Sequence, residues 1–214
     1  MASGQQGPFG NVHLLKNHWS GPAGPRGYYW YLTFAGAPEV CALAARCQQA
    51  IAFPYYDLVA PSGLHMTLDR IGAETAVTPA QLAAVGAAAS RACRDIPPFR
   101  ITVGPLAGWR GAVAFTAGPV RRIRLLRDAL RAATLSAFPA APVMRQEVAP
   151  HVTIAYGNTD DVPAADAVAA VEKLNSAAPR AEAAVTEAAL VLLERRDHAY
   201  VWETAARIPL SPGY

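Results

Sequence analysis

The sequence has few cysteines, few charged residues and no long apolar run. The three cysteines, Cys41, Cys47 and Cys93, are an odd number without metal-ligand spacing, so neither a disulfide framework nor a cysteine-based zinc site is indicated. No apolar run reaches the ~18 residues of a membrane span, because Arg, Asp, Gln or Pro interrupts even the alanine-rich stretches. These absences predict a protein of the reducing cytoplasm that has no membrane partner.

A targeting signal and a strong net charge are also missing. The first residues lack the cationic start and the apolar segment of a secretory signal. The net charge is only +3, so charge alone does not indicate a nucleic-acid partner. What the sequence does contain is 52% apolar residue types, which suits one large or two small globular domains and excludes extensive disorder.

Strands and helices are expected to alternate along the chain after an irregular leader. Residues 1–27 are rich in glycine and proline and predict a leader that runs over the surface. Apolar periodicity and proline positions predict helices at 38–50, at 78–93, from Pro119 onward and at 163–175. Strands are expected at 28–34, 64–71, 98–104, 111–117, 148–156 and 183–196, and a turn at 196–198 leads into a last strand.

The two halves of the chain repeat one order of elements around a short motif. LHMTL and PHVTI each follow a strand and a helix, and their histidines, His65 and His151, are 86 residues apart. A degenerate internal repeat is therefore predicted, and two copies are too few for a stacked array. We expect a single bilobal domain over residues 28–210. Its fold class is α+β, with two pseudo-symmetric lobes of antiparallel sheet, helices packed outside and an active-site cleft between the lobes.

The two motifs have the composition of a proton-transfer site. Side chains alternate along a strand, so His65 and Thr67 share one face, and His151 and Thr153 do the same in the second motif. An imidazole can take or give a proton, and a hydroxyl can donate a hydrogen bond to an anionic oxygen. Two such units across a cleft would bracket a phosphate, with one histidine as base and the other as acid. This chemistry needs neither a metal nor another cofactor.

Two other interpretations of the motif residues stay open. Each histidine could be an ordinary half-buried strand residue bonded to a neighbour, although their matched positions in a repeat argue against it. The second interpretation is a zinc site made by His65, His151 and Asp69, although the closely spaced ligand pairs typical of zinc sites are missing.

The motifs HMTL and HVTI in two similar halves resemble those of the two-histidine (2H) phosphoesterase superfamily. The resemblance covers about residues 28–210 and is strongest to the LigT-like group, which includes 2′-5′ RNA ligases and 2′,3′-cyclic phosphodiesterases. It implies that His65 and His151 are the catalytic acid and base. It also implies that Thr67 and Thr153 bind the phosphate oxygens of the substrate.

The stretch HVTIAYGN is similar to the second motif of plant-type cyclic phosphodiesterases, which implies that Tyr156 also contacts the substrate phosphate. Strict alternation would put Tyr156 on the face opposite His151, so this role requires the strand to end or bulge after Ile154. The first motif departs from the family pattern, because Asp69 and Arg70 follow it in place of apolar residues. Arg70 is expected either to reach the phosphate or to face solvent.

Two aromatic regions are further candidates. The stretch 17–30 is similar to a leader of actinobacterial LigT-like proteins, which would lay His18, Trp19 and Arg26 over the cleft. In the first strand, Tyr28 and Trp30 are expected in the core, and stacking on a nucleobase is the alternative.

The resemblance and the paired motifs together predict a metal-independent enzyme that hydrolyses 2′,3′-cyclic phosphates to a phosphomonoester. The expected substrate is an RNA end or a small cyclic nucleotide, and the protein is expected to act as a monomer. Two alternatives use the same residues. One is 2′-5′ ligation of RNA ends, and the other is a module that binds nucleotides or RNA ends without turnover.

Overall fold

The structure of the protein is a computed structural model that describes residues 12–142 and 149–211. Its strands are β1 (Gly27–Thr33), β2 (Tyr56–Leu58), β3 (His65–Ala73), β4 (Phe99–Trp109), β5 (Ala112–Gly118), β6 (His151–Gly157), β7 (Ala181–Val185), β8 (Glu187–Arg196) and β9 (Ala199–Pro209). Its α-helices are α1 (Pro38–Ala50), α2 (Pro79–Ala92), α3 (Val120–Ala137) and α4 (Ala165–Ser176).

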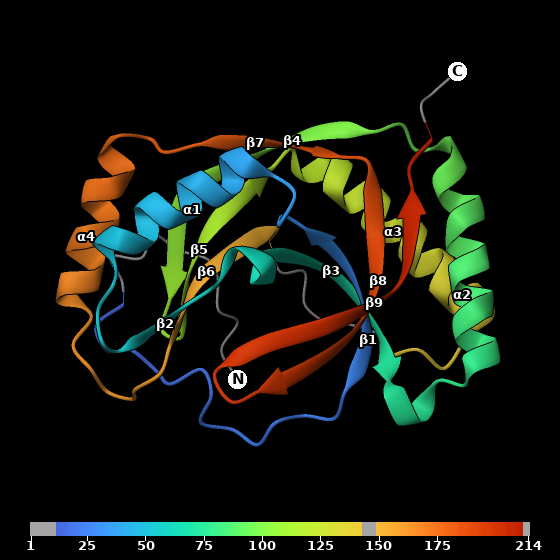
Figure 1. The fold of residues 1–214 in the computed structure, drawn as a ribbon, viewed down its shortest axis with the longest axis horizontal. Coiled ribbons are helices and arrows are strands. Elements are labelled where there is room, and N and C mark those ends of the chain that lie inside the picture. Colours follow the sequence, from blue (N-terminus) through green and yellow to red (C-terminus); the bar gives the residue numbers. More distant parts are fainter. Residues whose placement is uncertain (1–11, 143–148, 212–214) are drawn as a thin grey trace.

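The strands form two antiparallel sheets with helices against them (Figure 1). The four-stranded sheet has the order β3-β1-β8-β9, and the five-stranded sheet has the order β2-β6-β5-β4-β7. The prediction of an α+β fold with two lobes of antiparallel sheet is therefore confirmed. The expected turn after β8 is also present, since Asp197 adopts a left-handed backbone conformation between β8 and β9.

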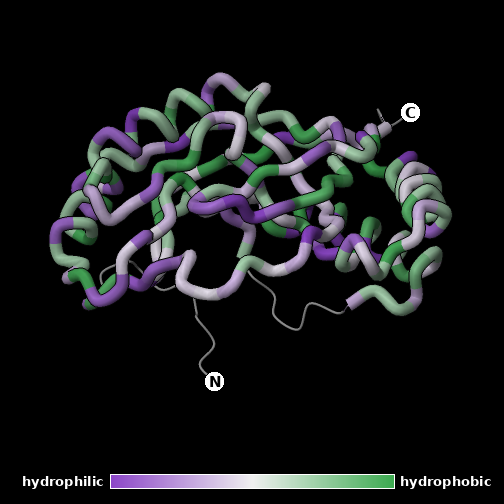
Figure 2. Tube along the Cα trace, turned by 60° about the horizontal axis from the view of Figure 1, so that its bottom comes forward, coloured by the Kyte–Doolittle hydropathy of each residue, from purple (hydrophilic) through white to green (hydrophobic). Residues whose placement is uncertain are grey.

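Local sequence signals explain where the helices form. Thr78 accepts a hydrogen bond from the backbone of Gln81 and receives a reciprocal contact from the Gln81 side chain, a capping box that starts α2. Along α3, apolar residues recur every three or four positions and are buried, at Ile123, Leu126, Leu130 and Ala133. In Figure 2 the colour changes between green and purple along the helices, as expected when only one face of a helix meets the core.

The two long helices that follow β1 and β5 each cross to the opposite sheet. Helix α1 follows β1 of the four-stranded sheet but packs against β6, β7 and α4. Helix α3 follows β5 of the five-stranded sheet but packs mainly against α2 and β3. Figure 1 accordingly shows α1 and α4 on one side of the molecule and α2 and α3 on the other. Neither half of the sequence forms a lobe alone, because each lobe needs a helix from the other half.

Residues 183–196, expected as one strand, belong to two strands in different sheets. β7 ends at Val185 in the five-stranded sheet, and β8 begins at Glu187 in the four-stranded sheet. Apolar residues continue across the join at Thr186, so the sequence pattern carries no sign of the change of sheet. The short strand β2 was not expected either, because it lies in a turn-rich passage and owes its conformation to pairing with β6.

One continuous core joins the two lobes. It includes Trp30 and Met66 from the four-stranded sheet and Phe115 and Ile154 from the five-stranded sheet, all almost completely buried. Trp30 donates its indole N–H to Thr134 of α3 at 3.0 Å, which satisfies both buried polar groups. Among the described residues, no helix combines the length and apolar character needed to cross a bilayer.

Candidate active site

The two motif strands meet where the sheets face each other. Strands β3 and β6 contact one another directly, although they belong to different sheets. Between them lies a cavity of about 250 Å³, called here the histidine cleft. Its lining residues are His18, Tyr29, Tyr31, His65, Thr67, Trp109, His151, Thr153, Tyr156, Leu193 and Tyr200. All five residues predicted for the site are thus brought together, and none of the described residues that line the cleft is acidic.

Both motif histidines are held in the same way. Nδ1 of His65 lies 2.8 Å from the carbonyl oxygen of Gly63, and Nδ1 of His151 lies 2.9 Å from that of Ala149. A carbonyl can only accept a hydrogen bond, so Nδ1 carries the proton in each neutral ring. Nε2 is therefore the nitrogen available to exchange a proton with a bound substrate.

Burial keeps both imidazoles neutral in the free protein. Desolvation lowers the pKa of His65 to about 4, and the nearby His151 adds a smaller effect in the same direction. Desolvation also lowers the pKa of His151. The ring of His65 stacks on Tyr31 at 4.3 Å, and that of His151 packs edge-on against Trp109 at 5.3 Å. A bound phosphate would favour the protonated form of a nearby imidazole, because opposite charges attract.

A β-bulge brings Tyr156 to the face that carries His151. In the pairing of β5 with β6, Ala114 lies opposite Thr153 and Val113 lies opposite Ala155, so Ile154 is an extra residue. The extra residue shifts the alternation by one, which is why Tyr156 lines the histidine cleft. The bulge after Ile154 that this position required is therefore present.

The Ile154 bulge is fixed by hydrogen bonds from outside its own strand pair. The carbonyl oxygen of Ile154 accepts a bond from the Val59 backbone at 2.9 Å and another from Gln48 Nε2 at 2.9 Å. The same Gln48 amide nitrogen also donates to the Val59 carbonyl at 2.7 Å. Helix α1, which comes from the other half of the sequence, therefore helps to set the direction of Tyr156.

Each motif threonine is paired with a tyrosine. The hydroxyl of Tyr31 interacts with the Thr67 side chain, and that of Tyr156 interacts with the Thr153 side chain. Burial raises the pKa of both tyrosines well above the ordinary value, so both phenols stay protonated. Tyr31 is almost completely buried, and nothing in the sequence distinguishes it from the other aromatic residues of β1.

The leader contributes a third histidine to the cleft. His18 stacks on Tyr156 with ring centres 4.3 Å apart, and its Nε2 lies 2.8 Å from the Tyr200 hydroxyl. Desolvation, with a smaller contribution from the positive charge of Arg195, lowers the pKa of His18 to about 4. The backbone of His18 donates to the carbonyl of Gly157 at 2.7 Å, where a side chain in place of glycine would collide with the leader.

The segment around His18 is anchored rather than loosely laid over the surface. Trp19 is buried and donates its indole N–H to Asp57 at 2.9 Å. His198 contacts the same carboxylate at 2.9 Å and stacks on Trp19. Leu15 is completely buried. The leader therefore places His18 in the cleft as expected, whereas neither Trp19 nor Arg26 lines it. Trp19 packs against Tyr156, and Arg26 pairs with glutamates.

The fold and the paired motifs agree with the comparisons to known proteins. A model of the 2′-5′ RNA ligase superfamily matches residues 33–197. The chain belongs to this superfamily. A comparison with curated protein sequences finds no match.

Solved structures give the same fold at low sequence identity. The protein TT0787 of Thermus thermophilus is 21% identical with a TM-score of 0.65, and the match covers 88% of this chain and 98% of that chain. LigT of E. coli, solved with NADP+, is 19% identical with a TM-score of 0.63 and is matched over 87% of this chain and 98% of its own. LigT solved with 3′-AMP matches with a TM-score of 0.61, the same identity and the same coverage.

The zinc triad considered from the sequence is not assembled in this superfamily member. Asp69 is almost completely buried and forms an ion pair with Arg131 of α3 at 3.1 Å, away from the two histidines. The register explains this direction, because Asp69 lies opposite Trp30, which faces the core. Within residues 12–142 and 149–211, no three His, Cys, Asp or Glu side chains are grouped so as to hold a metal.

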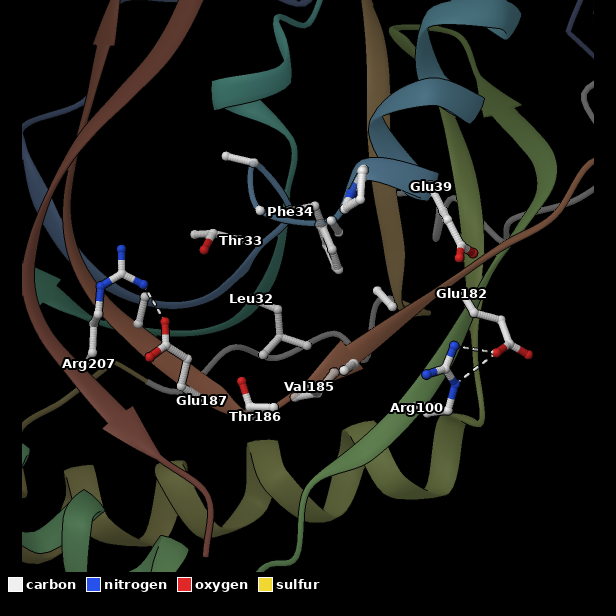
Figure 3. Close-up of a pocket in the computed structure, with 17 residues that line it drawn as sticks. Leu32, Thr33, Phe34, Glu39, Arg100, Glu182, Val185, Thr186, Glu187 and Arg207 are labelled. Carbon is white, nitrogen blue, oxygen red and sulfur yellow. Dashed lines mark hydrogen bonds and ion pairs between the residues drawn. The ribbon is translucent and has the colours of Figure 1, made fainter. Parts of the chain in front are cut away.

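A larger hollow lies elsewhere on the molecule. It has a volume of about 560 Å³ and lies where the end of β1 meets the join of β7 and β8 (Figure 3). The arginines that line it are already paired, Arg100 with Glu182 and Arg207 with Glu187. No histidine is among its described lining residues, so size alone does not mark the site.

Proposed function

We propose that this member of the superfamily is a phosphodiesterase that opens 2′,3′-cyclic phosphates without a metal. The observation that carries the proposal is the symmetry of the cleft. Two histidines on opposing sheets each hold Nδ1 on a backbone carbonyl, so that Nε2 is available, and each has a threonine on the same face of its strand. This arrangement suits a reaction in which one proton is removed and another is supplied on opposite sides of a phosphorus atom.

The chemical step follows from these positions. A water molecule attacks phosphorus while Nε2 of one histidine takes its proton. The bond from phosphorus to one ribose oxygen breaks, and the other histidine, which is protonated at Nε2 once the phosphate is bound, gives that proton to the oxygen, leaving a phosphomonoester. Thr67 and Thr153 donate hydrogen bonds to the two non-bridging oxygens, whose negative charge grows during the attack. The tyrosine partners of these threonines keep the hydroxyls in place.

The proposed substrate is a 2′,3′-cyclic phosphate on a small nucleotide or on an RNA end. The structures of E. coli LigT with 3′-AMP, with phosphate and with ATP support a nucleotide-sized ligand for this fold. The lack of acidic side chains among the described residues of the cleft lining also favours an anionic substrate. We also propose that the protein acts as a monomer in the cytoplasm. The three free thiols, Cys41, Cys47 and Cys93, support a reducing compartment.

The test is hydrolysis of 2′,3′-cyclic AMP in excess chelator by the wild type and by the variants His65→Ala and His151→Ala. We expect the wild type to produce one adenosine monophosphate isomer and each variant to lose at least ~100-fold in kcat. His13→Ala is the matched control, because His13 is exposed in the leader and outside the cleft. Activity that survives either cleft substitution nearly intact rules out the mechanism.

Ligation is the second candidate, because the superfamily is named for it and the same acid and base would serve. The 5′-hydroxyl of a second RNA end would then take the place of water, and the bond from phosphorus to the 3′-oxygen would break. Incubating cleaved RNA halves with the protein and searching for a 2′-5′ joined product separates the two reactions. Tight binding of the cyclic nucleotide with no product of either kind would instead identify a binding module.

A further inference from the structure

Arg70 lies on β3 beyond Thr67, next to Tyr29, which lines the histidine cleft. Arg26 and Arg131, the two other described arginines with a shielded nitrogen that lacks an acceptor, each form an ion pair with a carboxylate. Arg70 forms none with the described residues, and its Nε is shielded from solvent without a hydrogen-bond acceptor among them. A half-buried cation without a counter-charge is costly, and a bound anion would relieve that cost.

The register of β3 determines where this cation points. Tyr31 lies opposite Thr67 and Trp30 lies opposite Asp69, so Leu68 is an extra residue in β3. The bulge turns Asp69 toward the core and places Arg70 opposite Tyr29, on the cleft side of the sheet. Without the bulge Arg70 would face away from His65.

The contact between Arg70 and Tyr29 is consistent with this position. The guanidinium carbon lies 5.9 Å from the centre of the Tyr29 ring, which itself lines the cleft. A stacked guanidinium keeps its edge free to donate hydrogen bonds, and that edge suits phosphate. Arg70 is therefore held by an aromatic ring rather than by a carboxylate that would compete with an anionic ligand.

Resting on the proposed function, we infer that Arg70 binds a second phosphate of the substrate, the one on the 5′ side of the nucleoside that carries the cyclic phosphate. Arg70 is three residues beyond Thr67, up to about 10 Å further along the strand at roughly 3.3 Å per residue. A ribose and its 5′ methylene separate the two phosphates, which suits this offset. The leader occupies the Tyr156 side of the cleft, so the second phosphate is assigned to the other side, where Tyr29 and Arg70 lie.

The test compares adenosine 2′,3′-cyclic phosphate with the same compound phosphorylated at the 5′ position. We expect the wild type to show a higher kcat/KM for the 5′-phosphorylated substrate, and Arg70→Gln to reduce this preference ~10-fold or more. Arg70→Lys should keep part of the preference, because it retains the charge but not the planar group. The control is Arg91→Gln on the outer face of α2, which removes an exposed arginine and should leave the preference unchanged.

A dinucleotide that ends in a 2′,3′-cyclic phosphate separates the two sources of a second phosphate. If Arg70→Gln also lowers kcat/KM for the dinucleotide more than for adenosine 2′,3′-cyclic phosphate, the subsite binds the internal phosphodiester of an RNA end. If Arg70→Gln selectively lowers kcat/KM only for the 5′-phosphorylated mononucleotide, the subsite binds the 5′-monophosphate of a mononucleotide. The inference is overturned if Arg70→Gln lowers kcat/KM equally for the substrates with and without the second phosphate. It is also overturned if the variant lowers kcat/KM for none of them.

A binding measurement keeps this result separate from the proposed function. Titration calorimetry compares adenosine 2′,5′-bisphosphate with adenosine 2′-monophosphate on the wild type and on Arg70→Gln, and it needs no turnover. Inactivity on every cyclic substrate together with an Arg70-dependent preference for the bisphosphate would overturn the hydrolase proposal and keep the subsite. Hydrolysis without any such preference would keep the enzyme and overturn the subsite. The melting temperature of Arg70→Gln shows whether the variant is folded.

Discussion

The two motif strands build matching halves of the cleft with different supporting residues. In both strands the histidine is tied to the carbonyl two residues earlier, the threonine lies two residues later, and the next residue is a bulge. The partner of the threonine differs. Tyr31 on β1 lies opposite Thr67. The residue opposite Thr153 is the small Ala114, and the tyrosine next to Thr153 is Tyr156 of the motif strand itself.

The second position after the bulge also differs between the two motifs. Tyr156 occupies it in the second motif, and Arg70 occupies it in the first. The first half therefore has a cation where the second half has the partner of its threonine. The two motifs therefore share the histidine, the threonine and the bulge, and they differ in the side chains that surround these groups.

The largest expected effect separates the roles of the two histidines. A 2′-deoxynucleoside 3′-(4-nitrophenyl phosphate) has a leaving group that needs no proton. His65→Gln and His151→Gln should both lose about 10²- to 10⁴-fold on a cyclic nucleotide. On the nitrophenyl ester only one variant should stay strongly impaired, and that variant lacks the base. If both variants hydrolyse the nitrophenyl ester at near wild-type rates in a steady-state assay, the two histidines do not have separate acid and base roles.

The next effect concerns the two threonines. Thr67→Val and Thr153→Val each remove one hydrogen bond to a charged oxygen, which corresponds to a loss of roughly 10- to 100-fold in kcat/KM. Thr204→Val on β9 is the control, because Thr204 is exposed and outside the cleft. Losses below about twofold for both variants would show that the hydroxyls do not hold the phosphate.

A smaller effect is expected from the tyrosines that orient these threonines. Tyr31→Phe and Tyr156→Phe should each lower kcat/KM by about 2- to 10-fold, the equivalent of one ordinary hydrogen bond. A double-mutant cycle gives the sharper result. Adding Tyr31→Phe to Thr67→Val should not lower kcat/KM further. Adding it to Thr153→Val should lower kcat/KM by the full amount seen in the wild-type background, because each tyrosine orients its own threonine. Identical effects in both backgrounds would contradict this pairing.

The smallest effect is on stability and concerns the neutral histidines. The pKa values of His18 and His65 are lowered to about 4 in the folded protein, from the ordinary value of 6.5. Between these values the unfolded chain binds protons that the folded protein does not, so the free energy of unfolding falls as pH falls from 6.5 to 4. Above pH 6.5 these groups have no effect. Urea midpoints at pH 7.5 and 5.0 measure the difference, which should be smaller in His18→Gln than in the wild type. An unchanged difference would mean that His18 does not contribute.

Much of the local structure could be predicted from the sequence because it depends on neighbouring residues. Helix α1 lies where the Pro38 start and the apolar periodicity put it, and α2 follows the predicted cap at Thr78. The motif strands lie within a few residues of their expected limits. The condition on Tyr156 could also be stated in advance, because side-chain alternation is a local property.

The remaining features depend on residues that are distant in the sequence. The change of sheet at Thr186 has no local signal, because a buried strand has the same composition in either sheet. The resemblance of the leader predicted that His18 covers the cleft, but the backbone bond to Gly157 that holds it there has no signal in the glycine-rich leader sequence. The two bulges appear only when the partner strands are paired.

The residue types and their spacing were enough to identify the groups on which the proposed chemistry depends, two histidines and two threonines at matched positions of the chain. Local alternation is enough to put each histidine and its threonine on one face of a strand. Which further side chains lie near them depends on how distant strands pair. The register between strands turned Tyr156 into the cleft, Arg70 toward the cleft residue Tyr29 and Asp69 toward the core, because one extra residue in a strand reverses the direction of the side chains that follow it.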